Sequence, residues 1–295
     1  MLVGRMAYRP ATFELGRPIR LRHPVQPDHA LSVLNERITA LDNLLPDARN
    51  ADAFMRTRNE YLMWVEATEI KLSELTHDRT VAEQLYTARY WEIRRLVPTD
   101  ARPVPLIDGE RRAQRDALHG MRENLEMHVG RARSAPGHIT VLDTNTLLHY
   151  QLPDSINWPE VVGHEKVRLV IPLRVVEELD AKKWATGESQ KLRDRARALL
   201  PKLDALISLM GSPTPLDFPT TTIEVPVEFA SGTPRAKPVD ADEEILFTCR
   251  ELWQLSGQKG GVTLITGDIA MRIRAEALGG IKPLKLPDKY LREPS

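Results

Sequence analysis

The chain has 295 residues, 42% of them hydrophobic and 28% charged, and its 41 basic residues balance 41 acidic ones. This length suggests about two domains, and the zero net charge excludes an overall attraction to nucleic acid or membranes. The lone Cys249 excludes an intrachain disulfide and a cysteine-based zinc cluster. Because no stretch has the apolar length of a membrane span or a signal peptide, we expect a soluble protein of the reducing cytoplasm.

The first half of the sequence has the pattern of amphipathic helices. An irregular segment, residues 1–27, precedes a helical region that we assign to residues 28–136. Apolar residues recur every three or four positions from Leu31 to Leu45 and again from Phe54 to Leu75. These stripes predict a small helical bundle or helical hairpins, and an oligomerisation surface is the alternative.

Two further helices are expected before the pattern changes. One spans Thr80 to Leu96, and the proline-rich stretch VPTDARPVP ends it. The next begins near Asp108, which we take as its N-cap, and carries Leu118 and Met121 on one face.

From residue 137 to 295, strand-like and helical segments alternate. Strands are expected at HITVL, KVRLVIP, TTIEVPVEF and GVTLIT. Helices are expected at NTLLHYQL, LRVVEELDAKKW, SQKLRDRARALLPKLDALISLM, ADEEILFTCRELWQLS and DIAMRIRAEALG. Buried runs that alternate with helices predict an α/β domain with a mainly parallel central sheet.

Four carboxylates should lie at one edge of this sheet. Ligands of open parallel sheets bind outside the carboxyl ends of the strands. Asp143 directly follows ITVL, and Asp268 closely follows TLIT. Glu178 lies on the helix after RLVIP, and Asp242 lies at the start of the helix that carries Ile245.

Each acid alone has a simpler explanation. Asp143 and Asp268 could be helix N-caps, Glu178 a solvated helix residue, and Asp242 a member of the exposed cluster DADEE. Together, however, mutually repelling carboxylates at one edge need a cation to stay ionised. Hard oxygen ligands suit Mg²⁺ or Mn²⁺, which can activate water and stabilise an in-line phosphoryl displacement.

The motifs VLDTNTLLH, VIPLRVVEELDAKK, DADEEILFTC and LITGDIAMRIRAEALG resemble, in this order, those of PIN-domain nucleases. The likeness covers roughly residues 139–286 and is closest to PIN domains that in some bacteria accompany a PhoH-type ATPase, although the sequence contains no Walker loop. The resemblance implies a Rossmann-like fold and a metal-dependent endoribonuclease, usually selective for single strands. It assigns four catalytic and metal-binding residues, namely Asp143, Glu178, Asp242 and Asp268. Asn145 and Thr266 match supporting positions that could orient ligands or water.

For two of these four acids, a nearby acidic residue is an alternative candidate for the same role. Glu178 is preferred to Glu177 because the glutamate of the family usually precedes an apolar residue, here Leu179. Asp242 is preferred because the usual acid stands three positions before an isoleucine, here Ile245, on the same helical face. Further candidate ligands nearby are Asp240 and Glu243.

A basic patch on and after the Glu178 helix is a candidate for phosphate contacts. Together with two arginines that follow Asp268, its members are Lys182, Lys183, Lys191, Arg193, Arg195, Arg197, Arg272 and Arg274. A solvated face of an amphipathic helix is the alternative. Trp184 could stack on a base, although a structural role is more common, and His149 is expected to be a surface or packing residue.

We therefore expect a Mg²⁺- or Mn²⁺-dependent ribonuclease that acts on RNA and has no membrane partner. One alternative is a catalytically weak PIN-fold scaffold that binds RNA or protein. Another is the toxin of a toxin–antitoxin pair, which the long helical region disfavours. We recognise no family resemblance in the helical region; we expect it to dimerise the protein or to control access to the acidic edge. A homo-oligomer could form through either half.

Overall fold

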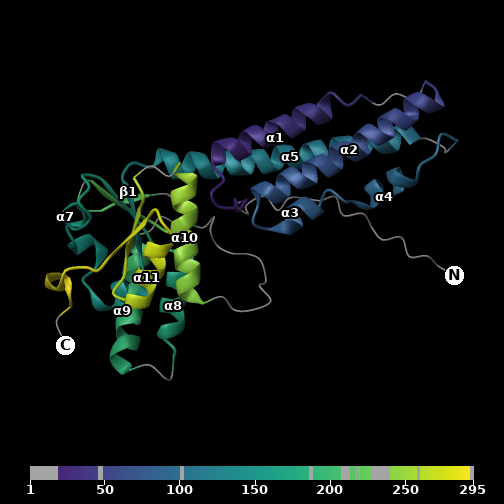
Figure 1. Cartoon of the computed structure of the whole chain (residues 1–295). Coiled ribbons are helices and arrows are strands. Elements are labelled where there is room, and N and C mark those ends of the chain that lie inside the picture. The colour runs from purple at the N-terminus through teal and green to yellow at the C-terminus, as the bar shows by residue number, and fades with distance from the viewer. Residues whose placement is uncertain are drawn as a thin grey trace. The chain divides into compact units, whose positions relative to one another are not determined.

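The computed structural model describes residues 19–45, 49–99, 103–185, 189–206, 213–216, 218, 220–226, 240–257 and 260–292. The chain divides into two compact units, Met1–His128 and Val129–Ser295 (Figure 1). The division falls inside the long helix α5 (Pro103–Ser134), which ends just before the domain boundary predicted at residue 137. No helix in the described ranges has the length and apolar character needed to cross a membrane.

In its described part, the first unit is a bundle of helices. They are α1 (Pro27–Asp42), α2 (Ala51–Leu75), α3 (Arg79–Glu83), α4 (Ala88–Arg95) and α5 as far as His128. The predicted stripes supply the core, with Leu34 and Ile38 of α1 and Tyr61 and Leu72 of α2 buried. Leu45 was expected on the first stripe, but it is 74% exposed because α1 ends at Asp42.

Two predicted helices of this unit have different bounds. The segment expected as one helix from Thr80 to Leu96 is two helices, because the Thr87 hydroxyl accepts a hydrogen bond from Tyr90 N at 3.0 Å and caps α4. The last helix begins at Pro103, where the missing proline N–H costs nothing. Asp108 is therefore not an N-cap; it lies inside α5 and pairs with Arg111 at 3.1 Å.

The second unit is built on a six-stranded sheet with the order β3-β4-β2-β1-β5-β6. The strands are β1 (His138–Leu142), β2 (Val167–Val170), β3 (Thr214–Pro215), β4 (Thr221–Glu224), β5 (Val262–Ile265) and β6 (Ile281–Leu284). All neighbouring strands are parallel except β3 and β4. The predicted α/β class with a mainly parallel sheet is confirmed, whereas the short edge strands β3 and β6 were not predicted.

The expected helices follow the strands. They are α6 (Thr144–His149), α8 (Leu173–Lys182), α9 (Gln190–Leu206), α10 (Ala241–Leu255) and α11 (Ile269–Ala277). The short helix α7 (Trp158–Val162) was not predicted. Short 3₁₀ helices span Pro153–Ser155 and Asp288–Tyr290. Two expected elements extend beyond the described ranges: residues 227–229 of TTIEVPVEF and residues 207–210 of the α9 pattern.

The central strand β1 explains where the first acid lies. Val141 and Leu142 have no exposed surface, because β1 lies between β2 and β5 inside the sheet. A central parallel strand is covered on both faces and therefore requires a continuous apolar sequence such as ITVL. The strand ends at Leu142, so Asp143 emerges at the carboxyl edge, where its N–H donates to the Ile265 carbonyl at 3.3 Å.

A buried ion pair joins the sheet to the end of α5. Arg168 of β2 donates through Nε to Glu224 Oε1 of β4 at 2.6 Å, and both side chains are almost fully buried. The same guanidinium donates to the Ala132 carbonyl at 3.1 Å, which satisfies a carbonyl group in the last turn of α5.

Removing Glu224 should strongly destabilise the protein. Glu224→Ala leaves the Arg168 charge buried without its partner, so the free energy of unfolding should fall by roughly 3–5 kcal/mol in chemical denaturation. The control Asp194→Ala breaks a half-exposed pair with Arg197 and should cost less than about 1 kcal/mol. Equal losses in the two variants would contradict this assignment.

His138 begins β1 and is held as a neutral imidazole. Its ring stacks on His164 with centroids 3.8 Å apart, and its Nε2 lies 2.8 Å from the Thr263 hydroxyl. Burial, with the nearby His164 and Lys282, lowers the pKa of His138 to about 4.

This imidazole makes stability depend on pH. An unfolded histidine has a pKa of about 6.5, so the unfolded chain takes up a proton before the folded one does. The contribution of His138 should be complete above pH ~6.5 and should be lost as the pH falls toward 4. Measured unfolding free energies should decrease over this range, and His138→Gln should flatten the decrease. The exposed-site variant His77→Gln should retain the wild-type slope.

Candidate active site at the carboxyl edge of the sheet

Asp143 is the most buried of the predicted acids, with only 2% of its surface exposed. Its Oδ1 accepts a hydrogen bond from Thr146 N at 2.6 Å and so caps α6. The N-cap interpretation therefore holds, yet it does not exclude a further role, because a carboxylate has about four lone-pair positions.

Thr266 connects Asp143 with Asp268. The side chain of Thr266 is fully buried, forms a hydrogen bond with Asp143, and accepts one from Asp268 N at 3.1 Å. Asp268 itself caps α11 by accepting from Met271 N at 2.8 Å, and its side chain is exposed. The supporting role of Thr266 stays a prediction, and these contacts show which two acids it touches.

Asp242 reaches the same edge from the first turn of α10. Its Oδ2 accepts a hydrogen bond from Arg274 Nη2 at 2.7 Å, and Arg274 Nη1 also lies 3.6 Å from Asp240. Asp242 is half-buried, whereas Asp240 and Glu243 are exposed. The buried Ile245 anchors this turn of α10.

A hydrogen bond joins Glu178 to the first residue of α6. The Thr144 hydroxyl, one residue after Asp143, donates to Glu178 Oε2. The neighbouring Glu177 is exposed and pairs with Arg174 at 3.3 Å instead. Glu178 is therefore the one of the two glutamates that contacts the residue after Asp143.

The acids at this edge influence one another electrostatically. Burial raises the pKa of Asp143, and the Asp242 carboxylate raises it further, while hydrogen bonds from Thr146 and Thr266 oppose the shift. Burial and the Asp240 carboxylate raise the pKa of Asp242; Arg274 lowers it and Asp268 raises it. Asp143, Asp242 and Asp268 therefore form one group of repelling charges.

The chemistry of this group suits a hard divalent cation, because all of its side-chain donors are carboxylate oxygens. As they stand, no three His, Cys, Asp or Glu side chains in the described ranges gather closely enough to hold a metal ion. The type of donor nevertheless fits Mg²⁺ or Mn²⁺, because these ions prefer oxygen ligands and usually retain several water molecules.

The other predicted residues have varied surroundings. Asn145 is exposed on α6. The half-buried Arg272 has its Nε enclosed without a hydrogen-bond partner among the described residues. Lys183 pairs with Asp180, and Arg197 pairs with Asp194. Two more of the residues predicted to contact nucleic acid are Lys182 and Arg193. The charge of Lys182 lowers the pKa of His149. Arg193 donates a hydrogen bond to the Ala185 carbonyl at 3.0 Å.

Sequence reasoning missed the roles of Thr144 and Thr146. The only signal was their position in DTNT: the residue three after an N-cap supplies the capped N–H. The contact from Thr144 to Glu178 spans 34 positions in the sequence, and no local pattern predicts it.

A Rossmann-like sheet with a cluster of acids at its carboxyl edge defines the class of this unit. Residues 140–281 match the family model described as the PIN domain, and this segment belongs to that family. PIN domains are generally nucleases, so the domain implies a nucleic acid substrate. Among curated proteins, none matches the chain.

Neutralising Asp143 should stabilise the metal-free protein. Asp143→Asn removes a buried charge near Asp242 but keeps an oxygen that can cap α6. With a chelator present, the melting temperature should rise by roughly 2–4 °C, about 1 kcal/mol for a unit of this size. Glu177→Gln, which removes an exposed charge beside the site, should change it little; a lower melting temperature for Asp143→Asn would contradict the proposed repulsion.

Proposed function

We propose that the second unit is a Mg²⁺- or Mn²⁺-dependent ribonuclease that hydrolyses phosphodiester bonds of single-stranded RNA. The observation that carries this proposal is the buried Asp143 carboxylate, electrostatically coupled to Asp242, at the end of the central strand of a PIN domain. A charge in this position lowers stability, so its presence is best explained by chemistry that needs it.

The residues proposed to hold the metal are Asp143, Glu178, Asp242 and Asp268. When bound, such an ion supplies an activated water and stabilises negative charge at phosphorus. Thr146 and Thr266 restrain Asp143, and Thr144 orients Glu178, in the manner of residues that support a ligand set. Arg274 stabilises the ionised form of Asp242 in the metal-free protein.

The preference for RNA rests on the resemblance of the motifs, and an exposed tryptophan supports an unpaired strand. Trp184 is 71% exposed after the end of α8. Lys183 Nζ lies 5.6 Å from its ring centroid, and the Arg197 guanidinium carbon lies 5.7 Å from it. An aromatic ring flanked by cations suits stacking on an unpaired base next to charged phosphates.

One observation favours the competing proposal of a non-catalytic scaffold. Arg274 already pairs with Asp242 and lies near Asp240, so part of the acidic group has a counter-ion from the protein itself. A scaffold would bind RNA without cutting it.

Adjacent glutamates provide a matched test of the enzyme. Glu178→Gln should reduce Mn²⁺-dependent cleavage of a labelled single-stranded RNA by more than about 100-fold, because it removes a proposed ligand. Glu177→Gln, one residue away but paired with Arg174, should cleave at a rate close to that of the wild type.

The outcomes separate the two proposals. Equal rates for both glutamine variants would contradict the assigned site. RNA binding without cleavage in any divalent metal would favour the scaffold.

A further inference from the structure

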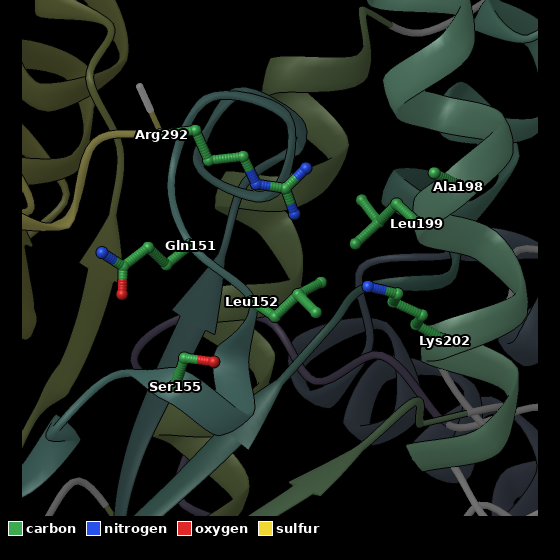
Figure 2. A pocket seen from close by; sticks show the side chains of 7 residues that line it. All are labelled: Gln151, Leu152, Ser155, Ala198, Leu199, Lys202 and Arg292. Atoms are coloured by element: carbon green, nitrogen blue, oxygen red, sulfur yellow. The ribbon is translucent and has the colours of Figure 1, made fainter. Parts of the chain in front are cut away.

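A cavity of about 300 Å³ opens beside α9 in the second unit (Figure 2). Its polar wall consists of Arg292, Lys202, Gln151 and Ser155. Leu152 and Leu199 supply its apolar wall. Figure 2 shows the Arg292 guanidinium and the Lys202 side chain extending from opposite sides toward the middle of the cavity.

The C-terminal segment fixes Arg292 next to the end of α6. Arg292 N donates to the His149 carbonyl at 3.1 Å, and Gln151 N donates to the Tyr290 carbonyl at 2.9 Å. An isolated antiparallel bridge pairs Tyr150 with Leu291. Because α6 starts at the Asp143 cap, this pairing holds the cavity at a set position relative to the acidic edge.

Three cations in and around the cavity are Arg195, Lys202 and Arg292. Within the part of the chain that the structure describes, no carboxylate pairs with Arg195, Lys202 or Arg292. Burial, together with the Arg195 guanidinium, lowers the pKa of Arg292. A cavity lined by unneutralised cations is an attractive environment for an anion.

Helix α9 carries positive charge on the face that lines the cavity. Arg195, Leu199 and Lys202 have the spacing of one helical face, and seven residues span roughly 10 Å. The charges of Arg195 and Asp143 both influence the pKa of His149: Arg195 lowers it and Asp143 raises it. Asp143 of the acidic group and Arg195 therefore both lie within electrostatic range of His149, whose carbonyl accepts a hydrogen bond from Arg292 N.

We propose that this cavity is a phosphate subsite, in which Arg292 and Lys202 bind a phosphate group of the nucleic acid strand whose cleavage is proposed for the acidic edge. The inference rests on the proposed function for the identity of the strand. A guanidinium can bind phosphate oxygens with two parallel hydrogen bonds, and an ammonium adds a point charge. Gln151 and Ser155 offer hydrogen bonds to the sugar, and Leu152 gives the base an apolar contact.

The test is equilibrium binding of single-stranded RNA to the full chain in a chelator, so that no cleavage occurs. Arg292→Gln and Lys202→Gln should each weaken binding about 10-fold at low salt and should reduce the slope of log affinity against log salt by about 0.7. The control Lys166→Gln removes an exposed cation just before β2, at the opposite edge of the sheet, and should leave affinity and slope unchanged. Melting temperatures close to the wild-type value verify folding of the three variants.

Comparing 5′-phosphorylated with 5′-hydroxyl RNA identifies the source of the phosphate. An equal effect of Arg292→Gln on both oligonucleotides indicates a phosphate within the strand; an effect limited to the phosphorylated one indicates its terminal group. Wild-type affinity and slope in both cavity variants would overturn the subsite, even if the wild type cleaves RNA.

The subsite can also be tested if the proposed function fails. In a chain that cleaves no RNA, inorganic phosphate should still raise the melting temperature of the wild type and of Lys166→Gln but not that of Arg292→Gln. The same increase in Arg292→Gln would overturn the subsite.

Discussion

Burial of the Asp143 carboxylate at the end of the central strand is the constraint on which this site depends. Strand β1 is covered on both faces, so the residue that follows it enters a poorly solvated edge. Thr146 and Thr266 form hydrogen bonds with the carboxylate there, while Asp242 opposes its ionisation. With hydrogen bonds alone, Asp242 still opposes the ionisation of Asp143, and Asp268 that of Asp242; a divalent cation would remove this repulsion.

Charge is separated locally in a chain whose total charge is zero. Acids gather where β1 and β5 end, and the cations Arg195, Lys202 and Arg292 lie on α9 and in the C-terminal segment. The proposed cleavage of a polyanionic strand would use both features: the cations would hold its phosphates, and the acids would recruit the ion that acts on one of them. The net charge of the chain does not reveal this arrangement, because it sums all acidic and basic residues without regard to their positions.

The sequence predicted those features that depend on local pattern. HITVL is β1 with the expected bounds, and the order of apolar runs and helices predicted the parallel sheet and the edge where Asp143 and Asp268 lie. The break at Thr87 was missed because a capping hydroxyl interrupts a helix without disturbing its apolar period.

Features that depend on distant pairing could not be predicted. Strand β6 contains Pro283 and is only four residues long, so its sequence lacks a strand pattern. The approach of Arg292 to His149 requires the C-terminal segment to pair with the chain after α6. Arg274 was expected to contact nucleic acid, and its contact with Asp242 depends on the packing of α11 against α10.

Direct titration with Mn²⁺ tests the central claim, that the acidic edge is a divalent-metal site. Calorimetry on the full chain should detect saturable binding that Mg²⁺ competes away, that Asp143→Asn and Asp268→Asn abolish, and that Glu177→Gln retains. Mn²⁺ binding of undiminished affinity in Asp143→Asn, or no binding by the wild type at millimolar Mn²⁺, would contradict the claim.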